Sequence, residues 1–497
     1  KSDLAEAHGG LALALSRQDN LDGALESYRE ALRLRPDVAG DHVNMGFILS
    51  ELGRRSEALA CYDRALALDP GMPDARTNRA YLLLLEGKLA EGWAEYEWRW
   101  KRPELPERPF PQPLWDGSPL DGKTIMLHAE QGFGDTLHFI RYARLVHERG
   151  GRVIVVCQRP LVALLSRCEA VEQVLAHGDP LPPFDVHAPL LSLPRIFGTT
   201  LANIPGDVPY IQGEPRTVAR WRDELGGVSD FKIGIAWQGS RAHRGDHGRS
   251  MPLSYFAPLA AISGVRLYSL QKNDGQEQLG QVSFGERIVD LSPRLESFDD
   301  TAAAMEHLDL VICCDTSVAH LAGALARPVW VAVATVPDWR WLLDRDDTPW
   351  YPTMRLFRQH RRGDWHDVFA RITSALAEWT GATMDVSTST LPSADQHGQQ
   401  TGEPADAHYK LGATHAAQRR WEEAAAGYRQ AVALRPGHAE AHRNLGDALR
   451  ELGRADEAIL NYGEALRLKG DFAEAHGGLA MALAQRGDLD GALTSCR

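Results

Sequence analysis

The sequence predicts a multidomain protein of mixed α and α/β class, in which helical repeats flank two units with parallel sheets. Near both chain ends, similar residues recur at a spacing of 34 positions, which is typical of a helical hairpin repeat. Between these regions, short apolar stretches alternate with longer helical stretches, as expected for parallel strands joined by crossover helices. The chain has 497 residues and 44% hydrophobic content, which allows about three domains with buried cores.

Composition and charge exclude several classes of protein. No apolar stretch approaches the roughly 18 to 20 residues that a bilayer crossing requires. The formal net charge is −13, so nucleic acid is not an expected partner, although a local basic segment can still bind a phosphate. The six cysteines form no CxxC pair, so neither a zinc cage nor a disulfide framework is indicated. We therefore expect a cytoplasmic protein without a membrane span.

Residues 1–106 are expected to form pairs of antiparallel helices. Positions separated by 34 residues carry matching side chains: Tyr28, Tyr62 and Tyr96; Ala24 and Ala58; Ala31 and Ala65; and Pro36 and Pro70. Small and aromatic residues suit the contacts between such helices, and proline ends the second helix of a pair. These residues resemble the tetratricopeptide repeat. A third unit keeps Tyr96 but has Arg79 and Arg99 at apolar positions, as expected for a repeat that adjoins another domain.

The same pattern returns in residues 405–497, where it includes Leu411, Gly412, Ala424, Tyr428, Ala431, Pro436, Leu445, Gly446, Leu449, Ala458, Tyr462 and Ala465. Segments 1–29 and 469–497 are identical at 19 of 29 positions, which indicates a recent duplication. The last unit is incomplete, so we expect the natural protein to continue with a period near 468 residues. We also expect the uncovered apolar face of this unit to fray or to self-associate.

Residues 115–212 are predicted to form the first α/β unit, with strands at 124–129 and 152–157 and a helix from about 137 to 149. The turn after the first strand contains Gly132 and Gly134, which permit close approach of a ligand to the backbone. It is neither a Walker loop nor a complete dinucleotide fingerprint. Asp135 at the head of the helix could be a helix cap or a general base.

Residues 213–379 are predicted to form the second α/β unit, after a connection at 213–230. Its expected strands are 232–237, 265–270, 287–291, 310–314 and 329–333. Residues 380–404 contain no Lys or Arg and are rich in Ser, Thr, Gly and Gln, which indicates a flexible linker.

The second unit is the better candidate for holding a nucleotide. The strand at 310–314 leads into Asp315, Thr316 and Ser317, and then into a helix of small residues that contains His320. Backbone N–H groups at Thr316 and Ser317 could bind a diphosphate with the helix dipole behind them. The alternatives are that these residues only cap the helix and that His320 is a packed core histidine.

A basic loop follows the strand that ends in Trp237. It contains Arg241, His243, Arg244, His247 and Arg249, and Arg249 is our candidate donor to a phosphate. Trp237, Ser250 and Gln271 are further candidates for substrate binding. A second basic segment, 355–362, follows the tryptophan-rich run 339–351, whose aromatic residues we expect to be packing residues.

These motifs together resemble the heptosyltransferase-type (family 9) glycosyltransferases of the GT-B fold. With the attached repeats, the arrangement is also similar to O-linked N-acetylglucosamine transferase and to bacterial flagellin glycosyltransferases. The resemblance covers about 115–379 and implies two Rossmann-like domains, a nucleotide-sugar donor on the C-terminal one, and inverting transfer without a cofactor or catalytic metal. It places Asp135 as base, Asp315 and Thr316 at the donor site, and Arg249 beside the leaving diphosphate.

The expected activity is therefore transfer of a sugar to a protein acceptor that the repeats present. Two alternatives remain open at this point: a glycan-extending enzyme of heptosyltransferase type, and a catalytically silent scaffold. Asp344 and Asp346 form a DxD pattern of the kind that holds a metal in other glycosyltransferases, but they lie past the second sheet, so we expect no metal there.

Overall fold

The structure is a computed structural model that describes residues 2–102, 110–242, 245–381, 402–417, 420–435, 437–470 and 472–486. The chain divides into two compact units, Lys1–Ser389 and Thr390–Arg497. The predicted linker, 380–404, lies almost entirely outside the described residues. No described helix combines the length and the apolar character that a bilayer crossing would need. The cysteines of the described part are buried free thiols.

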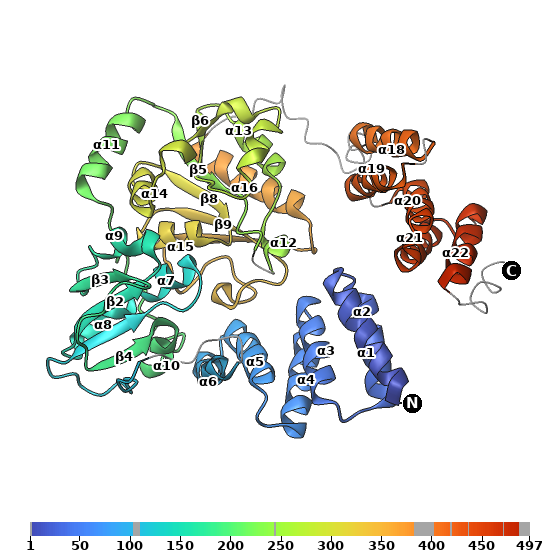
Figure 1. Cartoon of the computed structure of the whole chain (residues 1–497). Coiled ribbons are helices and arrows are strands. Elements are labelled where there is room, and N and C mark those ends of the chain that lie inside the picture. Colours follow the sequence, from blue (N-terminus) through green and yellow to red (C-terminus); the bar gives the residue numbers. More distant parts are fainter. Residues whose placement is uncertain are drawn as a thin grey trace. The chain divides into compact units, whose positions relative to one another are not determined.

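The first unit begins with three helical hairpins, which confirms the predicted repeats (Figure 1). The helices are α1 (Ser2–Arg17), α2 (Leu21–Leu34), α3 (Ala39–Glu51), α4 (Arg55–Leu68), α5 (Pro73–Leu85) and α6 (Leu89–Tyr96), followed by the 3-10 helix η1 (Glu97–Lys101). The three tyrosines at the repeat spacing, Tyr28, Tyr62 and Tyr96, are all buried between helices. At Gly46 a Cβ would lie 2.6 Å from the Tyr62 ring, so glycine is required for this close packing.

A four-stranded parallel sheet follows, with strand order β3-β2-β1-β4. Its strands are β1 (Thr124–His128), β2 (Arg152–Cys157), β3 (Gln173–Ala176) and β4 (Val186–Pro189). The predicted strands β1 and β2 are confirmed. The single helix expected at 137–149 is wrong, because the segment forms two helices, α7 (Phe133–Phe139) and α8 (Tyr142–Glu148). Two short helices, α9 (Val162–Leu165) and α10 (Leu193–Ile196), complete this half.

The second sheet has six parallel strands in the order β10-β9-β8-β5-β6-β7. They are β5 (Phe231–Ala236), β6 (Val265–Ser269), β7 (Ile288–Asp290), β8 (Leu310–Cys314), β9 (Val329–Val333) and β10 (Met354–Arg358). The five predicted strands are confirmed, and β10 is an additional one. The helices are α11 (Pro215–Leu225), α12 (Asp246–Arg249), α13 (Ala257–Ala260), α14 (Phe298–Met305), α15 (Ser317–Ala324) and α16 (Trp365–Thr380). The expected connection at 213–230 is thus mostly the helix α11.

One continuous apolar core runs through the first unit from Ala12 in α1 to Leu356 in β10. It joins the N-terminal hairpins to both sheets, so the repeats and the α/β halves pack as one body. Trp93 shows this packing, because its ring lies edge-on to Phe139 of α7 and to Trp339.

The second unit consists of further hairpins with their own apolar core. Its described helices are α18 (Gly402–Ala417), α19 (Trp421–Leu434), α20 (Ala439–Glu451), α21 (Ala455–Leu468) and α22 (Ala473–Arg486). Of the two outcomes expected for the last repeat, fraying does not begin at about residue 473 within the described residues, because α22 is a regular helix with Ala475, Ala482 and Leu483 buried; self-association stays a prediction. Leu489 and Leu493, which the same expectation includes, lie outside the described residues.

Candidate active site

The two α/β halves meet through helices that begin at the carboxyl ends of β1 and β8. Helix α7 follows β1, helix α15 follows β8, and the two helices pack against each other. Gly134 lies at their contact, because a Cβ there would be 2.8 Å from Cδ2 of His320. The glycine-bearing turn before α7 and the small-residue helix α15, which are far apart in the sequence, therefore lie at one junction.

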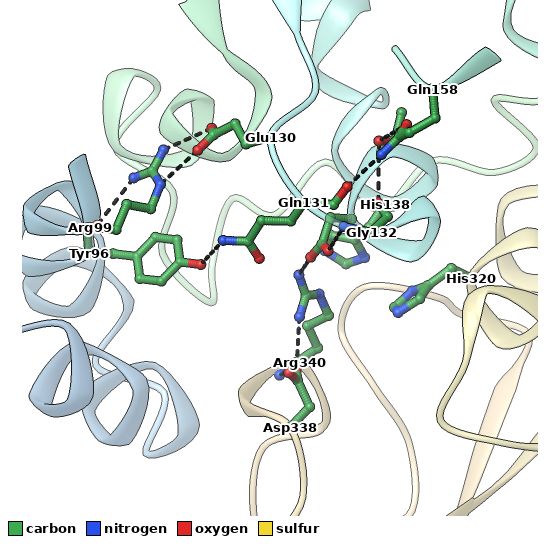
Figure 2. Close-up of polar contacts among 12 residues, drawn as sticks. Tyr96, Arg99, Glu130, Gln131, Gly132, His138, Gln158, His320, Asp338 and Arg340 are labelled. Atoms are coloured by element: carbon green, nitrogen blue, oxygen red, sulfur yellow. Dashed lines mark hydrogen bonds and ion pairs between the residues drawn. The ribbon is translucent and has the colours of Figure 1, made fainter. Parts of the chain in front are cut away.

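Asp135 lies in the first turn of α7 and is held by two donors. The Gly132 N–H donates to Asp135 Oδ2 at 3.0 Å, and the Arg340 guanidinium donates to Oδ1. Arg340 also donates to Asp338 Oδ1 at 2.9 Å (Figure 2). Burial raises the pKa of Asp135, while the Arg340 charge opposes that rise. The sequence left two roles open for Asp135, helix cap and general base. The contacts allow both roles, because each carboxylate oxygen that accepts a hydrogen bond here retains a second lone pair.

Thr316 occupies the N-cap position of α15, but its side chain does not cap the helix. Its hydroxyl oxygen is buried without a hydrogen-bond partner in the described part of the chain. Asp315 next to it is partly buried, and burial together with the nearby Asp338 raises its pKa to about 6. The start of this helix therefore offers unengaged polar groups, as an anion site requires.

Arg249 is the last residue of the short helix α12 in the segment after β5, and β5 pairs with β8, so this segment adjoins Asp315. The Arg249 Nε is buried and makes no hydrogen bond to any described residue, but it forms an ion pair with Asp246 Oδ1 at 3.6 Å. Ser250 Oγ accepts from the Gly239 N–H at 2.9 Å and donates to Asp246 at 2.8 Å, which fixes the loop. His243, Arg244 and the side chain of His247 lie outside the described residues.

Two predicted substrate-binding residues are instead engaged within the fold. Trp237 is fully buried, and its indole N–H donates to the Gly275 carbonyl at 3.1 Å. The Gln271 side chain accepts from the N–H groups of Trp237 and Gln238 and donates to the carbonyls of Gln238 and Asp274. Because all the hydrogen-bonding positions of this amide are occupied, Gln271 supports the loop that carries Arg249.

A buried hydroxyl connects the two halves. Tyr351 Oη lies 2.9 Å from Nδ1 of His138 in α7 and 3.0 Å from Nδ1 of His320 in α15. Burial, with the positive charges of Arg141 and Arg340 nearby, lowers the pKa of both histidines well below the usual range. Both rings are therefore neutral at neutral pH, and His320 also stacks on Trp341. His320 thus packs at the junction as well as lying beside the candidate donor site.

The last hairpin contacts the turn that leads to Asp135. Arg99 of η1 is buried and forms two hydrogen bonds of 2.9 Å with the Glu130 carboxylate (Figure 2). Gln131 donates to the Tyr96 hydroxyl at 2.9 Å. Arg99, one of the two arginines that depart from the repeat pattern, therefore joins the repeats to the site.

Sequence reasoning missed Asp338, Arg340, Tyr351 and Glu130, which is the partner of Arg99. A usable signal was present, because Asp338 and Arg340 alternate with Trp339 and Trp341, and charges between buried tryptophans need partners.

In the DxD segment, Arg345 pairs with Asp347 at 2.5 Å. Within the described ranges, no three or more His, Cys, Asp or Glu side chains gather as a metal site. Metal independence therefore stays a prediction.

Comparison with protein families agrees with this arrangement. The glycosyltransferase family 9 (heptosyltransferase) model matches residues 252–333, which include β6 to β9 and α15. Tetratricopeptide-repeat models match residues 5–38, 39–72, 403–470 and 457–497.

Known proteins similar to this chain include Protein FlbA of Caulobacter vibrioides, which is 27% identical over 320 residues. That match covers 59% of this chain and 53% of FlbA, so the chain spans about half the length of this curated relative. Escherichia coli ADP-heptose LPS heptosyltransferase II matches over 51% of this chain and 98% of its own, with 13% identity and a TM-score of 0.38. A family 9 glycosyl transferase from Veillonella parvula matches over 54% and 91%, with 9% identity and a TM-score of 0.40. The chain therefore carries tetratricopeptide repeats at both ends and, between them, a region that the glycosyltransferase family 9 model matches.

Proposed function

We propose that this protein transfers a sugar from a nucleotide diphosphate sugar to a hydroxyl group of a protein acceptor, with inversion at the anomeric carbon. The observation that carries the proposal is the meeting of α7 and α15. It brings a carboxylate, Asp135, to the same junction as the uncapped helix start at Thr316 and the Arg249 guanidinium. Such transfer needs a base for the acceptor and positive charge for the departing diphosphate.

The donor diphosphate binds at the start of α15 in this proposal. The backbone of Thr316 and Ser317, the Thr316 hydroxyl and Arg249 supply the donors, and the helix dipole adds favourable charge. Support comes from the buried Arg249 Nε and Thr316 Oγ1, which have no hydrogen-bond partner in the described part of the chain. A diphosphate bound at these groups would give both atoms a hydrogen-bond partner.

The transfer step uses Asp135 as the general base. The acceptor oxygen attacks the anomeric carbon, the bond from that carbon to the diphosphate oxygen breaks, and the hydroxyl proton passes to the Asp135 carboxylate. Arg340 opposes the rise in the pKa of Asp135 that burial causes, and it holds the carboxylate in place. Arg249 and the start of α15 stabilise the negative charge on the leaving diphosphate, so no metal is needed for this role.

A protein acceptor is favoured by the link between the repeats and the catalytic turn. Arg99 and Tyr96 of the last hairpin bind Glu130 and Gln131, which lie five and four residues before Asp135. An acceptor held by the repeats would therefore approach the base directly. The family description as heptosyltransferase favours a second candidate, a glycan acceptor.

The test is turnover and donor binding of Asp135→Asn, with Asp344→Asn as the matched control. We expect Asp135→Asn to lower turnover by about 10² to 10⁴-fold with nearly unchanged affinity for the nucleotide diphosphate. Asp344→Asn and EDTA should leave the rate unchanged. Normal turnover of Asp135→Asn would reduce Asp135 to a helix cap, and strict dependence on Mg²⁺ or Mn²⁺ would contradict the metal-free step. Transfer to lipopolysaccharide core and not to protein would favour the second candidate.

A further inference from the structure

One arginine is shared by two carboxylates at the candidate active site. Arg340 donates through Nη1 to Asp338 Oδ1 at 2.9 Å, as Figure 2 shows, and through Nη2 to Asp135 Oδ1. The exposed fractions of the three side chains are 8% for Arg340, 18% for Asp135 and 24% for Asp338. Because little water reaches these groups, their charges act on one another with little screening.

Aromatic rings fix the guanidinium between the two carboxylates. The guanidinium carbon of Arg340 lies 4.3 Å from the centre of the Trp339 ring and 5.5 Å from that of Phe139. Trp339 is buried and lies edge-on to Trp93. A cation is attracted to the face of an aromatic ring, so moving Arg340 toward one carboxylate would weaken this contact. The arginine is therefore held in a position from which it serves both carboxylates.

Asp338 also has a structural role that does not require its charge. It is the N-cap residue of the 3-10 helix η8 (Trp339–Trp341), and its Oδ1 accepts from the backbone N–H of Arg340 at 3.0 Å. A cap needs only a hydrogen-bond acceptor, which asparagine or serine supplies as well as aspartate. The negative charge of Asp338 beside the proposed base is thus separable from the cap.

The charges of the three residues balance only when Asp135 is protonated. With both carboxylates ionised, the group holds one more negative than positive charge, and an unmatched buried charge costs free energy. When Asp135 takes up a proton, Arg340 and Asp338 remain as a matched pair. Without the Asp338 charge, protonation of Asp135 would leave Arg340 unmatched instead. Asp338 therefore favours proton uptake by Asp135.

The other titratable groups around Asp135 are uncharged at neutral pH. The phenols of Tyr81 in α5 and Tyr96 in α6 interact with Asp135, and burial raises the pKa of both, that of Tyr96 to about 12. His138 and His320 at the same junction are neutral, because burial lowers the pKa of both. The pKa of Asp135 therefore responds mainly to the nearby charges, which are those of Arg340 and Asp338.

We propose that Asp338 is a positioning residue for the transfer step: it gives Arg340 a second partner, so that Asp135 stays in place and can still take the acceptor proton. The inference rests on the proposed function, because it takes Asp135 as the general base. A carboxylate that is the sole partner of an arginine is a weak base, and general-base catalysis becomes less efficient as the base becomes weaker. Asp338 thus balances two needs, a fixed carboxylate and a basic one.

The experiment measures the pKa of Asp135 directly, by carbon-13 NMR of the full chain labelled at its aspartate carboxyl groups, without substrate. The signal that Asp135→Asn lacks identifies the residue. We expect Asp338→Asn to lower this pKa by about 1 and Arg340→Gln to raise it by about 1, because they remove charges of opposite sign. Asp347→Asn is the matched control and should leave it unchanged, because Asp347 pairs with Arg345 at the same sequence spacing.

Two further measurements separate the charge of Asp338 from its cap. Asp338→Ser keeps a capping oxygen and should lower the pKa of Asp135 as Asp338→Asn does, with an unchanged near-UV circular dichroism spectrum. Turnover at neutral pH should fall by about three- to tenfold in both variants, because the base is weaker, while affinity for pyrophosphate stays the same. The acidic side of the pH profile of turnover should move to lower pH in both variants and to higher pH in Arg340→Gln.

Three results would overturn the inference. They are an unchanged pKa of Asp135 in the folded Asp338→Asn and Asp338→Ser chains, a shift in the same direction in Arg340→Gln, and an equal shift in Asp347→Asn. With impaired turnover of Asp135→Asn, any of them would refute the role of Asp338 alone. Normal turnover of Asp135→Asn, with the pKa shifts as expected, would instead refute the general base itself, and with it the role of Asp338 in transfer.

Discussion

Charged groups at the junction of α7 and α15 are partly or fully buried. Asp135 and Asp338 both accept from Arg340, while Asp315 lies near the charges of Asp338, Arg249 and Arg340. Burying a charge costs free energy unless hydrogen bonds and opposite charges replace water. The junction is therefore less stable than it could be, which is common where a site is shaped for a charged ligand.

Arg249 is expected to contribute directly to donor binding. Replacing it with alanine should weaken binding of a nucleoside diphosphate by about 1.5 to 3 kcal/mol, the range of a charge-assisted hydrogen bond. Isothermal titration calorimetry would measure this loss, and Arg345→Ala is the control because Arg345 pairs with Asp347. Equal affinity of Arg249→Ala and the unaltered chain would move the diphosphate to another site.

Asp315 is expected to make stability depend on pH. Burial and the nearby Asp338 raise its pKa to about 6, above the unfolded value of about 3.9. The folded chain therefore holds this proton more tightly, and stability falls as the pH rises from about 4 to about 6. Asp315→Asn should remove that fall and be more stable above pH 6 by up to about 3 kcal/mol.

Thermal unfolding at pH 7.5 and pH 4.5 would check this, since the gain should shrink at the lower pH. Asp347→Asn is the control of opposite sign, because its hydrogen bond to Arg345 lowers the pKa of Asp347. Lower stability of Asp315→Asn at pH 7.5 would mean that the Asp315 charge is compensated in the folded chain.

At the scale of elements, strands were easier to predict than helix ends. β8 and β9 are continuous apolar runs, and β1, β2, β5, β6 and β7 contain short apolar stretches, so the sequence shows these strands directly. β3 and β4 have only four residues each, and β10 carries Arg355 and Arg358, so the sequence pattern there indicated a basic segment. Arg358 donates to the carbonyls of Arg345 and Trp341, a use of charge that periodicity cannot reveal.

The break between α7 and α8 has a similar cause. Arg141 lies buried at the break, and its guanidinium donates to the carbonyls of His138, Trp350 and Pro205. One of its acceptors is thus a carbonyl in α7 itself, and two others are distant in the sequence. The candidate site was predictable only in part. Asp135, Thr316 and Arg249 follow predicted strands, so the sequence pattern indicates them. Arg340 and Tyr351 come from the segment after β9, whose contacts with the site the sequence pattern does not reveal.

The contact between α7 and α15 is expected to depend on Gly134. Gly134→Ala would place a methyl group 2.8 Å from the His320 ring and separate the helices, which lowers stability by about 1 to 3 kcal/mol. Turnover should fall as well, because Asp135 moves with α7. Chemical denaturation and a transfer assay would measure both effects.

Two further variants separate overpacking from a general effect of alanine. Gly134→Ala combined with His320→Ala should recover part of the stability that Gly134→Ala loses, because the clashing ring is gone. Gly10→Ala should have no cost, because nothing lies within 4 Å of its Cβ position. Full stability of Gly134→Ala would show that the two helices are not closely packed at this point.

At the scale of the whole molecule, the two sets of repeats have different relations to the two α/β halves. The N-terminal hairpins share one apolar core with both sheets and are joined to them by the buried Arg99 and Glu130 pair. The C-terminal hairpins have a separate core. The first set is therefore part of the same folding unit as the two sheets, and the second is expected to fold on its own.

This difference predicts the effect of two truncations. A chain of residues 1–389 should bind nucleoside diphosphate like the full chain and should lose only one transition in differential scanning calorimetry, because the second core is removed whole. A chain of residues 110–389 cuts the first core and leaves the Glu130 carboxylate buried without Arg99. Removing one partner of a buried pair costs about 3 to 5 kcal/mol, so this chain should unfold at a clearly lower temperature. If residues 110–389 melt as residues 1–389 do, the N-terminal repeats are an independent domain, and the acceptor path to Asp135 loses its structural basis.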